Sequence, residues 1–323
     1  RSISAMDIDA GIVSIVPSPV ATGTRHRHAI MSTTDRAASL SDQQIAFFND
    51  QGYLLLPGAL DPADFGPLRA VFEQAVDRQA GEWLAAGKIT DTCAGLAFEK
   101  RYAALREQLP PTFSNSWRKA IVSRPVYDLW QHPVLQGIAR SLLGDELYAS
   151  GTWNGRPRAP RQSVQTIDCH QDAHYMRDYA EGEPYAISVW MPLVPVDETS
   201  GCLQVIPGSH KRGYRPMVTL ERNGLRGLSD DDTAGREPFS AVMQPGDVLL
   251  FTELTHHRAL DNNSDYVRWS IDIRFFNPHT SPKLYERDTA VRNVGYYCFS
   301  AADPSRVEPY EAWAAKYDWD GEF

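Results

Sequence analysis

Cysteine is scarce in this chain of 323 residues, which holds only Cys93, Cys169, Cys202 and Cys298. The four form neither a CxxC pair nor a dense pattern, which excludes a small scaffold stapled by disulfides. A chain with so few cysteines is typical of a reducing compartment, and we predict a cytoplasmic protein.

Long apolar runs and an excess of basic residues are missing as well. No stretch of 18 apolar residues exists, so the sequence predicts no transmembrane helix. The net charge is -9 and the isoelectric point is about 5.5. Nucleic acids and anionic membranes require a basic face, so we expect neither as a partner.

The composition is that of a globular protein, with 42% hydrophobic and 23% charged residues. Residues 1–39 differ in texture from the rest, and we interpret them as a flexible leader or tag-like segment, with Met31 a candidate start. Residues 40–323 are then expected to form a single domain, as a monomer or a homodimer.

Helical patterns dominate the first hundred residues of this domain. Ser41 and Asp61 are expected to cap helices, and Gly144 to end one. A strand is predicted at 52–58, and helices at 62–87, 97–108, 114–123, 125–143 and 308–316. From about residue 147 short strands alternate with Pro, Gly and Asn-Ser turns. The fold class is thus mainly β with flanking helices: a double-stranded β-helix (jelly-roll, cupin-like) core with an N-terminal helical layer.

The chemistry centres on the segment from Cys169 to Tyr175, which reads CHQDAHY. His170 and Asp172 are two apart, and on a strand such residues share a face. An imidazole and a carboxylate that converge supply two-thirds of a 2-His-1-carboxylate triad, which binds iron(II) and leaves positions open. The HxD pattern alone is weak, because a His and an Asp on a strand or turn are common. Cys169 would point to the other face and is not expected to be a ligand.

Several downstream motifs add weight to this interpretation. They are Trp190-Met191-Pro192-Leu193, the GCLQVIPGSHK segment at 201–211, the PGDVLLF segment at 245–251, and His257 followed by Asn262, Ser264 and Arg268. In this order the set resembles the phytanoyl-CoA dioxygenase family of iron(II)/2-oxoglutarate oxygenases, over roughly residues 41–280. The resemblance implies Fe(II), 2-oxoglutarate and O2 as cofactor and cosubstrates.

The third metal ligand must come from a distant strand, and His256 and His257 are the candidates. They would point to opposite faces of an extended segment, so only one fits. The family spacing of Asn, Ser and Arg after this histidine is met by His257. We therefore predict that His170, Asp172 and His257 are the metal ligands and the catalytic centre.

The resemblance also assigns residues to the cosubstrate. Arg268 is the expected partner of the distal carboxylate of 2-oxoglutarate, since a guanidinium binds a carboxylate through two hydrogen bonds. Four other candidates for the 2-oxoglutarate site are Gln165, Thr166, Trp190 and Arg156. His174 and Arg274 are candidates for substrate contact, although Arg274 would alternatively pair with an acid. His210 is expected to brace a turn.

The reaction implied is hydroxylation or a related oxidation of a small-molecule substrate, coupled to the conversion of 2-oxoglutarate to succinate. A secondary metabolite is the preferred substrate. Two alternatives stay open: a non-catalytic, ligand-binding cupin-like barrel, and a zinc-dependent hydrolase, since two His and one carboxylate also suit zinc. Turnover of 2-oxoglutarate distinguishes all three.

Overall fold

The structure is a computed structural model that describes residues 12–13, 30–31, 39–110, 117–161, 168–175, 186–289 and 294–317. Gln165 and Thr166 lie outside these ranges, so their predicted contact with 2-oxoglutarate stays a prediction. No described helix is both long and apolar enough to cross a membrane.

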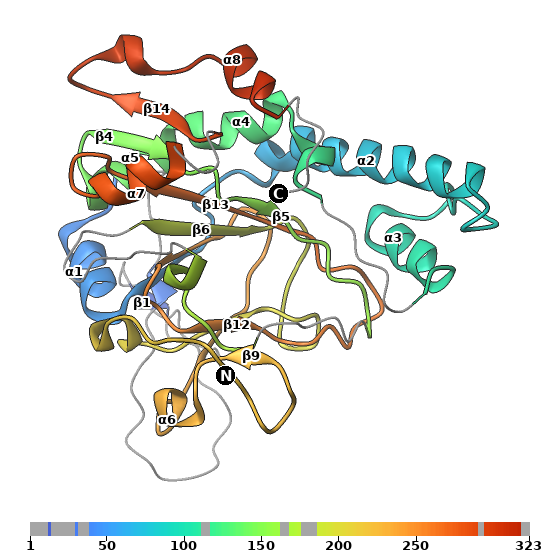
Figure 1. Cartoon of the computed structure of the whole chain (residues 1–323), viewed down its shortest axis with the longest axis horizontal. Helices are drawn as coiled ribbons and strands as arrows, with labels where there is room; N and C mark the ends of the chain where they lie inside the picture. The colour runs from blue at the N-terminus through green and yellow to red at the C-terminus, as the bar shows by residue number, and fades with distance from the viewer. Residues whose placement is uncertain are drawn as a thin grey trace, which may run out of the picture.

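Two β-sheets face each other at the centre of the molecule (Figure 1). The larger sheet has the order β14-β4-β13-β6-β11-β3, with β5 paired to β13, and the smaller has the order β10-β7-β12. The larger sheet consists of β3 (Tyr53–Leu56), β4 (Glu146–Ala149), β5 (Asn154–Gly155), β6 (Ile187–Pro192), β11 (Val248–Thr252), β13 (Ser270–Phe276) and β14 (Tyr296–Ser300). The smaller consists of β7 (Leu203–Val205), β10 (Phe239–Ala241) and β12 (His257–Ala259). Within the described residues the two sheets do not close into a barrel, and the arrangement is the predicted double-stranded β-helix core.

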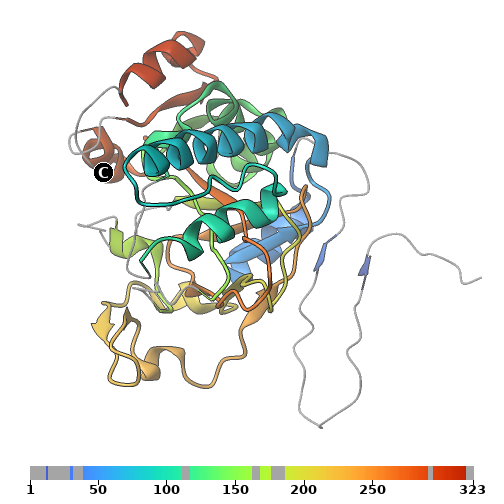
Figure 2. The same cartoon turned by 90° about the vertical axis from the view of Figure 1, so that its right-hand side faces the viewer.

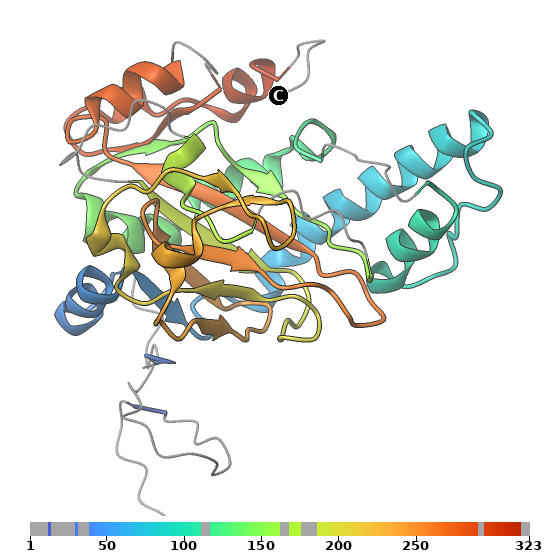
Figure 3. The same ribbon diagram turned by 60° about the horizontal axis from the view of Figure 1, so that its bottom comes forward.

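The helices between residues 42 and 143 lie around the larger sheet, and those at 66–85 and 98–107 stand in front of it in Figure 2. They are α1 (Asp42–Gln51), α2 (Gly66–Ala85), α3 (Phe98–Glu107), α4 (Arg124–Gln131) and α5 (Pro133–Leu143). Near the C-terminus, α7 (Pro282–Arg287) and α8 (Tyr310–Ala315) lie at the end of the sheet that carries β14 (Figure 3). The remaining elements are short: β1 (Ile12–Val13), β2 (Ile30–Met31), β8 (Val218–Thr219), β9 (Arg226–Gly227), α6 (Asp230–Thr233), and the 3-10 helices at 62–65, 119–121, 172–175, 209–212 and 304–306.

The helix ends follow the sequence in most places. Ser41 accepts a hydrogen bond from Gln44 N and forms a capping box, and Asp61 caps the 3-10 turn that leads into α2. Gly144, with φ of 83°, ends α5 as predicted. His210 Nε2 donates to Asn49 O at 3.1 Å and so braces its turn, also as predicted.

Two predicted helices are wrong in detail. The expected helix at 125–143 is broken into α4 and α5 at His132, which is extended with ψ of 123°. The following Pro133 explains the break, because proline disfavours a helical conformation in the residue before it. In the expected helix at 114–123, the described residues hold only the 3-10 turn Lys119–Ile121.

Strand β13 shows how the layers position the functional face. All seven of its residues are buried, yet they alternate in character. Ile271, Ile273 and Phe275 belong to the apolar core, whereas Ser270, Asp272 and Arg274 point the other way, toward the space between the sheets. A strand buried on both faces usually reads as continuously apolar, so a polar row inside the sheet pair indicates a functional site.

Candidate metal and cosubstrate site

Two histidines come together through a short backbone bridge. His170 and His257 form an isolated antiparallel bridge in which each N–H donates to the other's C=O, both at 2.9 Å. Because β12 is the edge of the smaller sheet, the His170 segment extends that sheet by one residue pair. Directly opposed residues place their side chains on one face, and the two imidazole rings lie 4.3 Å apart between centroids.

The strand geometry expected for the HxD segment is wrong. His170 occupies the bridge, but Asp172 begins the 3-10 helix Asp172–Tyr175. The carboxylate still reaches the imidazoles, with Oδ1 at 4.0 Å from His170 Nε2 and 3.7 Å from His257 Nε2. Candidate ligand atoms of these three residues all lie within 4.8 Å of one another, which is a separation that one metal ion can span.

Hydrogen bonds and burial keep both histidines neutral, with one ring nitrogen free to bind a metal. Nδ1 of His170 lies 2.9 Å from Asp168 O, and Nδ1 of His257 lies 2.9 Å from Thr255 O. A carbonyl accepts only, so each Nδ1 carries the proton and each Nε2 keeps a free lone pair directed at the carboxylate. Burial lowers the pKa of His170 to about 3 and also lowers the pKa of His257. Both rings are therefore neutral at pH 7 and able to bind a metal.

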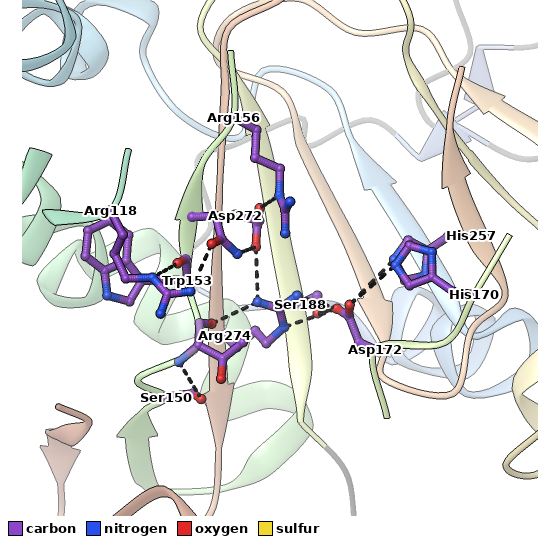
Figure 4. Close-up of polar contacts among 12 residues, drawn as sticks. Arg118, Ser150, Trp153, Arg156, His170, Asp172, Ser188, His257, Asp272 and Arg274 are labelled. Carbon is purple, nitrogen blue, oxygen red and sulfur yellow. Dashed lines mark hydrogen bonds and ion pairs between the residues drawn. The ribbon is translucent and has the colours of Figure 1, made fainter. Parts of the chain in front are cut away.

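Asp172 is ionised by its surroundings. Ser188 Oγ donates to Oδ2 at 2.8 Å, and Arg274 donates to the same oxygen from Nη2 at 2.6 Å and from Nε at 3.1 Å (Figure 4). Burial opposes the charge, but the Arg274 guanidinium outweighs it and holds the pKa of Asp172 well below its usual range. The result is a buried anion whose other oxygen, Oδ1, faces the histidines.

The choice between the two adjacent histidines agrees with the geometry. His257 belongs to the cluster, whereas His256 is fully buried elsewhere, and among the described residues its two ring nitrogens have no hydrogen-bond partner. Burial lowers the pKa of His256 to about 4. Cys169 packs in a separate small apolar cluster with Ile206 and Leu228, which agrees with the prediction that it is no ligand.

Arg268 is a buried cation without an anion. Its Nη1 donates to Ser270 Oγ at 2.7 Å, its Nε has no partner, and its guanidinium lies 5.5 Å from the ring of Trp190. In the described part of the chain no carboxylate forms an ion pair with it. Burial, with Arg158 and Arg156 nearby, lowers the pKa of Arg268 to about 9. Such a group stabilises an incoming carboxylate, and Trp190 forms one wall beside it.

Other predicted residues take different partners. Arg274 is buried between Asp172 and Asp272, so it pairs with acids, the alternative that the sequence left open. Arg156 is half exposed and pairs with Asp272, although it also contributes to the positive field at Arg268. His174 was expected to face the same way as Asp172, but a 3-10 turn has three residues per turn, and its Nδ1 lies 3.2 Å from the Tyr214 hydroxyl.

Sequence reasoning missed Ser188 and Asp272. The signal for Asp272 was present in the alternation Arg268, Ser270, Asp272, Arg274, in which polar residues recur every second position of a strand. For Ser188 the prediction named the nearby Trp190 instead. Asn262 and Ser264 entered the prediction only through their spacing from His257. In the structure they build the turn before Arg268, where Asn262 Nδ2 donates to Arg158 O and Tyr266 O.

The fold and the site together define a class: a double-stranded β-helix protein with a His-Asp-His cluster that could hold a metal and a buried arginine, Arg268. The family model for phytanoyl-CoA dioxygenase matches residues 48–270. The chain belongs to this family, and it is an iron(II)- and 2-oxoglutarate-dependent oxygenase that uses O2.

Relatives and solved structures agree with this class. The chain is 30% identical over 160 residues to 1-deoxypentalenic acid 11-beta-hydroxylase from Streptomyces arenae, a match that spans 46% of this chain and 55% of the relative. It is 26% identical over 242 residues to the enzyme of that name from Streptomyces exfoliatus, spanning 71% and 78%. Among structures, the carbocyclase SnoK from nogalamycin biosynthesis has a TM-score of 0.53 at 20% identity, covering 84% of this chain and 92% of that one. EctD from S. alaskensis with bound Fe has a TM-score of 0.51 at 21% identity, covering 77% and 80%.

Proposed function

We propose that His170, Asp172 and His257 hold one Fe(II), that Arg268 holds the distal carboxylate of 2-oxoglutarate, and that the enzyme hydroxylates a C–H bond of a small secondary metabolite. The observation that carries the metal assignment is the convergence of two Nε2 atoms and Oδ1 in one buried place. With 2-oxoglutarate and O2, iron supplies the oxidant for C–H hydroxylation, and the cosubstrate leaves as succinate and carbon dioxide.

The chain's own residues perform three tasks in this scheme. The carbonyls of Asp168 and Thr255 fix the tautomer of the two histidines. Arg268 anchors and orients the cosubstrate through two parallel hydrogen bonds. His257 is only 5% exposed and Asp172 3%, whereas the His170 side chain is 18% exposed, so bulk water is kept from two of the three ligands.

Arg268 also separates this proposal from its two rivals. A zinc hydrolase uses the same ligand types but has no need of a buried guanidinium beside them. A non-catalytic barrel would need neither the triad nor the cation. A buried charge without a counter-ion is costly, so it indicates an anionic ligand.

The preference for hydroxylation rests on coordination number. His170, Asp172 and His257 would hold the iron, and 2-oxoglutarate and O2 would need the positions that these residues leave open. With Asp172 among the ligands, no position would be left for a halide. Supplying chloride with a competent substrate and weighing the product tests this: a chlorinated product would show that Asp172 is not a ligand.

The substrate class is supported by the relatives, since two matched sequences are named as hydroxylases of 1-deoxypentalenic acid and one similar structure is a carbocyclase from nogalamycin biosynthesis. The monomeric or homodimeric state and the cytoplasmic location stay predictions. Light scattering during size-exclusion chromatography measures the first of these.

The experiment for the proposed function is an assay of succinate formed from 2-oxoglutarate, in the presence of Fe(II) and O2. We expect succinate at a rate that depends on both, and a rise in that rate when a competent small secondary metabolite is added. Zinc-dependent hydrolysis with no succinate would overturn the proposal.

A further inference from the structure

Four charged side chains of alternating sign form a line that ends at the metal ligand. Arg156 pairs with Asp272, Asp272 pairs with Arg274, and Arg274 pairs with Asp172 (Figure 4). Arg156 is half exposed, whereas the other three side chains are each 4% exposed. The line therefore runs from the surface into the centre of the site.

The guanidinium of Arg274 has all its sides occupied. Nε and Nη2 donate to Asp172 Oδ2, while Nη1 donates to Asp272 Oδ2 at 3.0 Å and to Thr152 O at 2.8 Å. Burial would lower the pKa of Arg274, but Asp172 and Asp272 raise it above the usual value. A lysine has one ammonium and cannot reproduce this planar fork.

The two oxygens of Asp172 are used unequally. Oδ2 receives three hydrogen bonds, two from Arg274 and one from Ser188, so its acceptor capacity is filled. Oδ1 is the oxygen that faces His170 and His257. A rotation of the carboxylate that brought Oδ2 to a metal would break charge-assisted bonds, which are the strongest kind in the site.

We propose that Arg274, held in place by Asp272, is a positioning residue that limits Asp172 to binding the metal through Oδ1 alone. This rests on the proposed function, because it takes the triad as the ligand set. One-oxygen coordination leaves three positions for 2-oxoglutarate and oxygen, whereas two-oxygen coordination would leave two. Asp272 has a second effect, since its negative charge offsets Arg274 and so leaves Asp172 an effective anionic ligand.

The test uses the full-length protein with Mn(II) in place of iron and without cosubstrate. The variants are Arg274→Lys, which keeps the charge and loses the fork, and Asp272→Asn, which keeps the shape and loses the charge. Two quantities are measured: the Mn(II) dissociation constant, and the water-proton relaxation rate per bound Mn(II), which reports the number of metal-bound waters. Asp145→Asn, which removes an exposed partner of Arg140, is the matched control.

We expect both variants to weaken Mn(II) binding about 10- to 100-fold, the usual effect of losing a partner behind a metal ligand. In Arg274→Lys the relaxation rate per metal should fall by about one third, because a two-oxygen Asp172 replaces one of three waters on an octahedral ion. Asp145→Asn should change neither quantity.

Wild-type Mn(II) affinity and relaxation in both variants would overturn the inference. If Arg274→Lys does not fold, as judged by circular dichroism, Asp272→Asn decides by its metal affinity alone. Failure of the proposed function would be a separate result. In that case the His257→Ala variant would bind Mn(II) as tightly as the wild-type protein does.

Discussion

At the scale of single residues, the sequence was enough to select His170, Asp172 and His257, but not to predict the backbone conformation that brings them together. The spacing of His170 and Asp172 correctly predicted that their side chains converge, although the reason was wrong. A 3-10 turn after a single bridge pair leaves no periodic signal, so residue spacing alone does not distinguish it from a strand. Likewise the pairing of Arg274 with Asp172 depends on contacts between residues 102 apart.

Arg268→Met is predicted to weaken 2-oxoglutarate binding while the metal stays bound. The change removes the buried cation, and the loss of a charge-assisted pair of this kind costs on the order of 2–5 kcal/mol. The apparent constant for 2-oxoglutarate should rise by at least about 30-fold, measured by calorimetry with Mn(II) present. An unchanged constant would move the anchor to another cation, with Arg156 the first candidate. Arg140→Met, on the exposed surface, serves as the control.

His256 is predicted to make the stability of the metal-free protein depend on pH. Its pKa is about 4 in the folded protein because the ring is buried, and about 6.5 in an unfolded chain. Below pH 6.5 the unfolded state therefore binds a proton that the folded state does not, and the free energy of unfolding falls as the pH decreases toward 4. The contribution is about 3 kcal/mol over that interval.

Urea unfolding of wild type and His256→Leu at pH 4.5 to 7.5 measures this difference. The leucine variant should lose part of the slope, while His170 and His257 contribute equally in both proteins. Parallel curves for the two proteins would contradict the assignment.

At the scale of elements, β13 joins the helical layer to the site. Trp269 stacks on Phe98 of α3 at 4.8 Å between centroids and contacts Phe72 of α2 at 5.2 Å, and it stands directly between Arg268 and Ser270. The sequence predicted helices packed on one face of a β-core, but not which residues of the helices contact which residues of the sheet. Those contacts join residues far apart in the chain: Trp269 and Phe98 are 171 residues apart, and Trp269 Nε1 donates to Phe98 O.

Trp269→Ala is predicted to lower the free energy of unfolding by about 3–5 kcal/mol, because it leaves a large cavity among fully packed rings. The affinity for 2-oxoglutarate should fall with it, since the segment just before β13 that carries Arg268 loses its support. Chemical denaturation and calorimetry measure the two effects. Trp269→Phe keeps most of the packing and is expected to lose less of both, and a loss below about 1 kcal/mol in the alanine variant would contradict this role.

At the scale of the whole molecule, an acidic chain contains a buried arginine, Arg268. The net charge is -9, yet Arg268 lies buried near Arg156 and Arg158. From the composition we predicted that polyanions are not partners. The composition could not predict the positive charges near Arg268, because a net charge contains no information on the position of each charge. Arg268 is therefore a buried positive charge that the net charge of the chain does not reveal.

Binding of 2-oxoglutarate is predicted to stabilise the whole fold. With Mn(II) present and 2-oxoglutarate at about 100 times its dissociation constant, the free energy of unfolding should rise by about 2.7 kcal/mol. Thermal unfolding at fixed ligand concentrations checks this. Arg268→Met should keep the stabilisation by metal and lose that by 2-oxoglutarate, and an equal response in both proteins would contradict the role proposed for Arg268.

The central claim is that His170, Asp172 and His257 bind a single Fe(II). Anaerobic titration of the metal-free protein with Fe(II), followed by calorimetry, tests it most directly when wild type, His257→Ala and His256→Leu are compared. We predict one Fe(II) per chain for wild type and for His256→Leu, and no binding at the site for His257→Ala. Full binding by His257→Ala, or its loss in His256→Leu, would contradict the assignment.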